Sequence, residues 1–244
     1  TADSNGDHQV IYDMLRDNIN LVNDNLAVVL RNWARETLPN LDSQDIRISI
    51  IEVIGNFCNA IRDFRLGSRA SNLEIAITGY EVALTVFTRQ EYPENWAITQ
   101  NNLAITYNNR IRGERADNLE MAISAYREAL SVYTREEFPF EWAKIQNNLA
   151  NAYLYRIRGE KAENLELAIA AFLASLSVHT REAFPIDNAE TLYNLGLTYR
   201  DNSQLPEAYN TLNTAIETVE SMRSEIIIGG EADRQKLAEE WNKL

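Results

Sequence analysis

The strongest constraint on this sequence is a 46-residue spacing of its prolines and glycines. Three prolines and three glycines recur at that spacing: Pro93, Pro139 and Pro185, and Gly67, Gly113 and Gly159. An Asn-Leu-Glu motif repeats with them, beginning at Asn72, Asn118 and Asn164, and Gln-Asn-Asn-Leu-Ala begins at Gln100 and Gln146. A fixed period of this size is typical of repeat architectures. The chain is therefore expected to be built from repeated units.

Apolar residues inside each unit follow the period of an α-helix. Leu119, Ala122, Ile123 and Tyr126 lie one, three or four positions apart, which places them on one helical face. Strand signals are nearly absent, since no segment alternates cleanly and no Asn-Gly turn separates two apolar runs. Proline favours a helix start and glycine a helix end. Each unit thus predicts two helices, A from the proline to the glycine and B from the Asn-Leu-Glu motif onward.

A single helix pair cannot bury its own apolar face, whereas stacked pairs can. We therefore expect an all-α, right-handed superhelical solenoid of antiparallel helix pairs. The expected segments are N-terminal capping helices at 1–44, four pairs over 45–228 (about 45–90, 93–136, 139–182 and 187–228), and the start of a further, truncated helix at 229–244. Trp241 and Leu244 in the last segment lie on a face that no later residue of the sequence covers.

The helix pairs resemble tetratricopeptide repeats (TPR). The resemblance is sharpest over 192–216, where apolar and small residues take the spacing of the roughly 34-residue form of the family. The matching positions are Leu192, Leu195, Gly196, Tyr199, Ala208, Leu212 and Ala215. The other units match with six extra residues between the helices.

The longer unit carries Asn-Asn-Leu-Ala in helix A and an Arg-Ile-Arg-Gly turn. In this it is similar to the repeat regions of cyanobacterial TPR proteins that bear a C-terminal caspase-like CHAT domain. The residues 237–244 resemble the helix that leads toward that domain. The resemblance implies a cytoplasmic bacterial regulatory protein. It implies no protease activity for this sequence, because no part of the protease is in it.

In the TPR family, helix A lines a concave surface that binds peptides or partner helices. The resemblance therefore implies partner-binding residues on the A helices at Asn59, Asn101, Asn102, Ile105, Asn108, Lys144, Asn147, Asn148, Asn151, Tyr155, Tyr193, Asn194, Leu197 and Arg200. Asparagine is a poor helix former, so its recurrence needs a reason. An amide that both donates and accepts suits an extended peptide backbone. The alternative is that one asparagine of each pair bonds a neighbouring helix or loop; ligand contact is favoured for Asn101 and Asn147 only.

Basic residues also repeat. Six of them follow the A helices: Arg110, Arg112 and Arg115, and Arg156, Arg158 and Lys161. They predict either a docking edge for an acidic partner or local pairing with acids such as Glu114 and Asp117, and local pairing is favoured. Four arginines lie at the ends of the B helices, where a positive charge interacts favourably with the negative end of the helix dipole. They are Arg35, Arg89, Arg135 and Arg181. The A-helix cations Arg62, Lys144 and Arg200 are too widely spaced to form the carboxylate clamp of some family members.

The charge balance excludes several partners. Acidic residues outnumber basic ones to give a net charge of −13, which disfavours nucleic acid and anionic membranes. No apolar run is long enough for a transmembrane helix. The single cysteine, Cys58, rules out an intramolecular disulfide and fits a reducing compartment.

No catalytic or cofactor site is expected. One cysteine and the distant His8 and His179 supply neither a transition-metal site nor a Cys–His pair. His179 takes the place of Phe87 and Tyr133 in other units, so it is interpreted as a packing residue. Cys58 replaces an alanine of the repeat and is expected to be buried. Gly229-Gly230 predicts a turn between helices and not a phosphate loop.

The sequence therefore favours a non-catalytic protein-binding module that takes a peptide or partner protein in a concave groove. It would be the scaffolding or sensing part of a larger bacterial regulatory protein. Two alternatives remain. One is self-assembly through the solenoid ends, with a monomer or weak self-association as the expected states, and the other is intramolecular regulation of a caspase-like domain.

Overall fold

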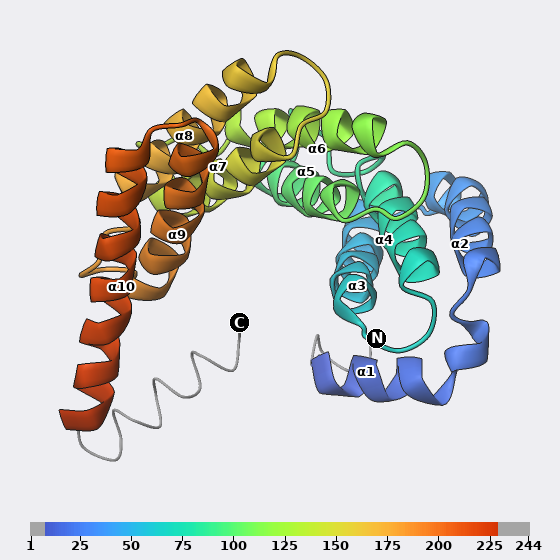
Figure 1. The fold of residues 1–244 in the computed structure, drawn as a ribbon. Coiled ribbons are helices and arrows are strands. Elements are labelled where there is room, and N and C mark those ends of the chain that lie inside the picture. The colour runs from blue at the N-terminus through green and yellow to red at the C-terminus, as the bar shows by residue number, and fades with distance from the viewer. Residues whose placement is uncertain (1–7, 229–244) are drawn as a thin grey trace. The chain divides into compact units, whose positions relative to one another are not determined.

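The computed structural model describes residues 8–228 of the chain, drawn as a coloured ribbon in Figure 1. Within these residues the structure is helical, with two short 3-10 turns and no strand. The helices are α1 (His8–Asp17), α2 (Asp24–Thr37), α3 (Gln44–Asp63), α4 (Arg69–Ala83), α5 (Pro93–Asn108), α6 (Arg115–Leu130), α7 (Pro139–Leu154), α8 (Lys161–Leu176), α9 (Pro185–Asp201) and α10 (Leu205–Ile228). The expected all-α fold of helix pairs is confirmed. The predictions for 1–7 and 229–244 lie outside the described residues.

Proline and glycine bound the A helices as their chemistry requires. Pro93 and Pro185 stand at the first positions of α5 and α9, where a missing amide hydrogen costs nothing. Gly113, in the loop after α5, has a φ of +75°, a conformation that residues with a Cβ avoid. The helix boundaries therefore follow from local backbone chemistry.

In two of the repeats, the asparagine of the Asn-Leu-Glu motif binds the loop that precedes helix B. Asn72 is fully buried, and its Nδ2 donates to the carbonyl oxygens of Phe64 and Leu66, each at 3.1 Å. Asn118 donates in the same way to the carbonyl of Arg112 at 2.8 Å. These bonds pair the side-chain nitrogen with loop carbonyls, so the motif sets the path of the chain between the two helices of a pair.

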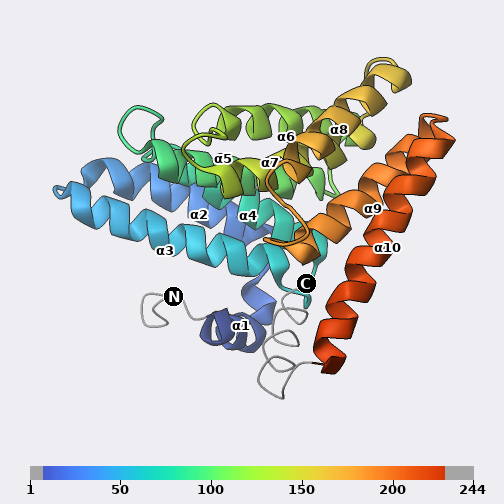
Figure 2. The ribbon, with the colours of Figure 1, turned by 90° about the vertical axis from the view of Figure 1, so that its left-hand side faces the viewer.

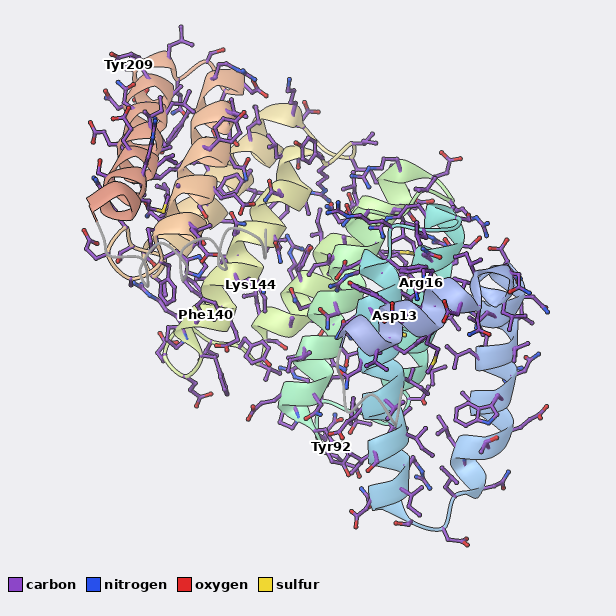
Figure 3. All side chains as sticks on the ribbon, turned by 90° about the horizontal axis from the view of Figure 1, so that it is seen from below. Asp13, Arg16, Tyr92, Phe140, Lys144 and Tyr209 are labelled. Atoms are coloured by element: carbon purple, nitrogen blue, oxygen red, sulfur yellow. The ribbon has the colours of Figure 1, made fainter. Side chains whose placement is uncertain are left out.

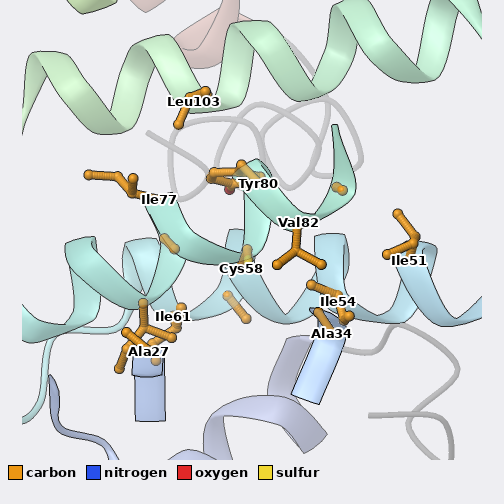
Figure 4. Close-up of a cluster of buried hydrophobic side chains, with 14 of the residues drawn as sticks. Ala27, Ala34, Ile51, Ile54, Cys58, Ile61, Ile77, Tyr80, Val82 and Leu103 are labelled. Carbon is orange, nitrogen blue, oxygen red and sulfur yellow. The ribbon is translucent and has the colours of Figure 1, made fainter. Parts of the chain in front are cut away.

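The chain forms two compact units, residues 1–137 with 155–158 and residues 138–154 with 159–244. In the first unit, α3 pairs with α4 and α5 with α6, α4 contacts α2 and α5, and α1 contacts α3. Its core gathers side chains from α2 to α5, as Figure 4 shows, with Ala34 from α2, Ile54 and Cys58 from α3, and Tyr80 from α4. Cys58 is fully buried, as expected.

In the second unit, α7 pairs with α8 and α9 with α10, and α8 contacts α9. The last pair runs side by side along its length (Figure 2). His179, just after the end of α8, is 1% exposed. Its ring lies 5.5 Å from that of Phe140 and 5.3 Å from that of Phe184, centroid to centroid. The expectation that His179 is a packing residue is confirmed.

Candidate functional site

Several predicted site residues in the first unit hold helices together. The hydroxyl of Tyr80 on α4 donates to Oδ1 of Asn59 on α3 at 2.7 Å. Arg62 donates to Oδ1 of Asn102 on α5 at 3.3 Å and binds the carboxylate of Asp63 at 3.0 and 2.9 Å. These bonds link α3 to α4 and α5. The guanidinium of Arg62 is thereby engaged on all three of its nitrogens.

A different set on α5 presents an open face. Ile98, Asn101, Ile105 and Asn108 follow one another at steps of three, four and three, so they lie on one side of the helix. Ile98 is 50% exposed, and the other three are partly buried. The Oδ1 atoms of Asn101 and Asn108 are buried, and no donor among the described residues reaches either one. We call these four residues the α5 stripe.

On α7, in the second unit, one of the predicted asparagines contacts another helix. Oδ1 of Asn147 accepts from the hydroxyl of Thr191 on α9 at 3.2 Å. Asn151 donates from Nδ2 to the backbone carbonyl of Asn147 at 3.0 Å. Asn148 is partly buried, whereas Lys144 is exposed one turn from Phe140 (Figure 3). The α7 face thus presents Lys144 to solvent and commits Asn147 to α9.

The predicted residues on α9, and Tyr155 in the other unit, are more open. Tyr193 is 55% exposed, and Asn194 and Leu197 are partly buried. Arg200 donates to the carboxylate of its neighbour Asp201 at 3.0 and 2.8 Å. Tyr155 is 60% exposed and belongs to the first unit with residues 155–158. Tyr193 and Leu197 therefore form the accessible apolar part of the α9 face.

A cavity of about 870 Å³ opens between α9 and α10. Its lining residues are Ile186, Ala189, Glu190, Tyr193, Leu212, Ala215, Ile216, Val219, Glu220 and Met222. Partial burial raises the pKa of Glu190 above its ordinary value, and the nearby charge of Asp187 adds to that rise. We call this cavity the α9–α10 groove. Sequence reasoning found Tyr193 but missed the α10 side, although Ile216, Val219 and Met222 follow helical spacing there.

Several of the basic residues after the A helices are paired with acids of other repeats or helices. Arg110 binds Glu74 at 2.7 and 2.8 Å, and Arg156 binds Glu120 at the same two distances. Both acids are the Glu of the preceding Asn-Leu-Glu motif. Arg158 also binds Asp117. The favoured expectation of local pairing is wrong for Arg110 and Arg156, because the preceding repeat supplies the acid in each case.

Two of the arginines after the B helices, Arg89 and Arg181, also reach the next repeat. Arg89 donates to the backbone carbonyl of Ser131, which follows α6, at 3.4 Å. Arg181 donates to the carbonyl of Glu217 on α10 at 3.1 Å. The expected placement near helix ends therefore understates their role, since each ties one B helix to the following one.

The described residues show no cluster of three or more His, Cys, Asp or Glu side chains that could share a metal ion. Burial raises the pKa of the Cys58 thiol to about 12, so this sulfur stays protonated and is a poor nucleophile. Between residues 8 and 228, none of the helices combines the length and the apolar character needed to cross a bilayer.

Two comparisons with known proteins bear on this arrangement. The sequence pattern described as "Tetratricopeptide repeat" matches residues 96–138, which cover most of α5 and α6. The crystal structure of BtubC (BKLC) from P. vanneervenii is similar in fold, with a TM-score of 0.54 and 19% identity over 81% of this chain and 89% of that chain. No curated protein sequence matches the chain. These findings support a TPR-like protein, a kind of fold that generally mediates protein–protein interaction and is generally non-catalytic.

Proposed function

We propose that this protein is a non-catalytic interaction module that binds an extended peptide segment of a partner along the α5 stripe. The observation that carries the proposal is the pair of buried, unpartnered amide oxygens on Asn101 and Asn108. A buried acceptor without a donor costs about 1–3 kcal/mol. Neither oxygen is exposed to solvent, so each side chain must turn outward before a backbone N–H of a bound peptide can pair with it and remove that cost.

The spacing of the stripe supports a peptide as the ligand. Asn101 and Asn108 lie seven residues apart on a helix, which is about 10.5 Å along its axis. In a polyproline II chain, which has three residues per turn and rises about 3.1 Å per residue, backbone groups three residues apart face the same side and lie roughly 9 Å apart. Ile98 precedes Asn101 on this face and Ile105 lies between Asn101 and Asn108, so both would contact the side chains of the peptide. Binding would thus combine main-chain hydrogen bonds with apolar contacts.

The wider setting belongs to the same proposal. The Asn-Asn-Leu-Ala helix and Arg-Ile-Arg-Gly turn resemble the repeats of cyanobacterial CHAT-associated proteins, which supports a scaffolding or sensing role in a cytoplasmic bacterial regulator. Exposed Tyr155 and Tyr193 and partly buried Leu197 offer further apolar contact for a partner protein. Self-association is the competing possibility, and light scattering over a range of concentrations tests it through the apparent mass.

The proposal is tested with selected peptides. A random peptide library displayed on phage is selected against the full chain, and the peptides obtained are titrated by fluorescence anisotropy. The Asn101→Ala/Asn108→Ala variant should lose about fivefold in affinity for each amide. Ile98→Lys should weaken binding as well, because it places a charge beside the apolar contacts.

The matched control is Asn32→Ala, which removes an exposed amide from α2 in the same unit and should leave affinity unchanged. Circular dichroism establishes that each variant is folded. Equal affinities for the wild type and the double variant would show that the peptides bind elsewhere and would refute the α5 stripe as the site.

A further inference from the structure

One end of the α5 stripe carries an acid without a partner. Ile98 begins the stripe, and Glu94 precedes it by one turn on the same helix. Both side chains are exposed, and the carboxylate of Glu94 forms no ion pair or hydrogen bond within residues 8–228. A ligand on the stripe therefore meets an unpaired negative charge next to Ile98.

A second acid lies beside this end, on the neighbouring A helix. Glu52 of α3 is 46 residues before Ile98, so it holds the same position in its own repeat. The two helices contact each other, and Arg62 of α3 binds Asn102 of α5 at 3.3 Å. Because adjacent repeats stack in register, Glu52 flanks Ile98. It is exposed, and no described residue forms an ion pair or a hydrogen bond with its carboxylate.

The other end of the stripe is different, because its charges are already paired. Arg62 holds the position of Asn108 one repeat earlier. Two nitrogens of its guanidinium bind the carboxylate of Asp63, and the third binds Asn102. The α5 helix has no Lys or Arg of its own. A peptide that lies along α5 therefore meets two free carboxylates near Ile98 and no cation of α5.

Gly55 on α3 leaves open space beside Glu52. The two residues are three positions apart and share a helical face. A β-carbon added to Gly55 would have no neighbouring atom within 4 Å. Two repeats later the equivalent residue is Asn147, whose side chain accepts from Thr191 on the adjacent A helix at 3.2 Å. Glycine thus leaves open, between α3 and α5, the space that an asparagine side chain fills in the second unit.

We propose that the peptide bound by the α5 stripe is basic and places one Lys or Arg side chain over Gly55. The charge of that side chain pairs with Glu52 and Glu94, and its methylene groups contact Ile98. Long basic side chains suit such a site, since their stems pack on apolar surface while their charge stays near water. The net charge of −13 also attracts a basic partner.

This inference rests on the proposed function, because it takes for granted that a peptide lies along α5. It also fixes where the basic residue stands in the peptide. Ile98 precedes Asn101 by about 4.5 Å along the helix axis, and a polyproline II chain rises about 3.1 Å per residue. The basic residue is then about one or two positions from the residue whose N–H pairs with Asn101.

The peptides selected from the random phage library against the full chain provide the probes, and they should be enriched in Lys and Arg. Each is titrated by fluorescence anisotropy as selected and with every Lys or Arg replaced in turn by alanine. Glu52→Gln should lower the affinity for the selected form about two- to fivefold, and adding Glu94→Gln should lower it further. For one alanine form, Glu52→Gln should have no further effect, because the paired charge is already gone.

Ionic strength gives an independent readout of the same pairing. Raising it from about 0.1 M to about 1 M shortens the reach of exposed charges from about 10 Å to about 3 Å. The affinity of the wild type for the selected peptides should therefore fall more than that of the Glu52→Gln/Glu94→Gln variant. The matched control is Glu36→Gln, which removes an exposed acid from α2 in the same unit and should leave affinity unchanged.

Gly55→Leu tests the open space without changing any charge. Leucine is a better helix former than glycine, so α3 should stay folded, and circular dichroism checks this. The new side chain would fill the space beside Glu52. Affinity for the selected peptides should fall severalfold, whereas the alanine form that is insensitive to Glu52→Gln should be affected less.

Two results would overturn the inference and leave the α5 stripe as the peptide site. The selected peptides could show no excess of Lys and Arg. Alternatively, Glu52→Gln and Gly55→Leu could bind them as tightly as the wild type does, while Asn101→Ala/Asn108→Ala loses affinity. Unchanged affinity in that double asparagine variant would instead refute the proposed function and this inference with it, so the two failures are distinguishable.

Discussion

Cys58 on α3 packs directly beneath Gly79 on α4, with no space left for a side chain at residue 79. A β-carbon added to Gly79 would collide with Sγ of Cys58 and lie 3.3 Å from Cγ2 of Ile54. The equivalent pairs of the next two repeats are Ala104 with Ala125 and Ala150 with Ala171. The larger residue on α3 is thus matched by the smaller one on α4.

The first prediction is a double-mutant cycle on this pair. Gly79→Ala should lower the free energy of unfolding by about 1–3 kcal/mol, because it overpacks a filled core. Adding Cys58→Ala recreates the Ala–Ala pair of the other repeats and should recover most of that loss. Urea denaturation followed by circular dichroism measures both effects. Simple additivity of the two single changes would contradict the packing account.

The second prediction compares two glycines with different surroundings. A β-carbon at Gly55, inside α3, would have no neighbouring atom within 4 Å, so Gly55→Ala should raise the free energy of unfolding by about 0.5–1 kcal/mol. Gly113 has a φ of +75°, and Gly113→Ala should lower the free energy of unfolding by about 1–2 kcal/mol through backbone strain. Denaturant unfolding of the two variants in parallel tests the opposite signs. Equal changes in the free energy of unfolding for the two variants would show that the backbone conformation of the glycine does not determine the sign of the effect.

The third prediction concerns the ion pair between Arg110 and Glu74. Their side chains are only 23% and 18% exposed and form two hydrogen bonds. Glu74→Gln should therefore lower the free energy of unfolding by about 1.5–3 kcal/mol. The control is the exposed pair of Arg16 with Asp13 on α1 (Figure 3), where Arg16→Gln should lower the free energy of unfolding much less than Glu74→Gln does, because solvent screens exposed ion pairs. A loss at Glu74 no larger than the loss at Arg16 would contradict the structural role.

The fourth prediction is a pH dependence that His179 causes. Burial lowers the pKa of its imidazole below the ordinary value of 6.5; Asp187 opposes the shift and Lys144 adds to it. The buried Nε2 has no hydrogen-bond partner among the described residues. The unfolded chain therefore takes up a proton at a higher pH than the folded chain does. The free energy of unfolding should be highest above about pH 6.5 and fall as the pH drops below that value.

The variant His179→Phe tests this directly. Phenylalanine occupies the equivalent position 87, so it fits the repeat, and it cannot take up a proton. The fall in unfolding free energy between pH 7 and pH 5 should be smaller in the variant than in the wild type. Identical pH profiles would assign the dependence to other groups.

Features that depend on single residues, or on a residue's position in the repeat, were predictable from the sequence. The start of α5 at Pro93 and the turn at Gly113 were predictable, because both depend on the φ angles and hydrogen-bonding capacity of single residues. The burial of Cys58 and His179 was predictable from their places in the repeat, since equivalent positions have equivalent neighbours. Periodicity also placed Ile98 and Asn101 on one face of α5.

The partners of polar side chains were not predictable in this way. Oδ1 of Asn147 bonds Thr191 and is occupied, whereas Oδ1 of Asn101, the same residue one repeat earlier, is buried without a donor among the described residues. Arg110 reaches back to Glu74 of the preceding repeat and not to the adjacent Glu114. The sequence by itself determined the helices and the faces on which side chains lie, because these depend on neighbours along the chain. Only the tertiary structure decided which amides stay unpaired and where the α9–α10 groove opens, because both depend on how one helix packs against the next.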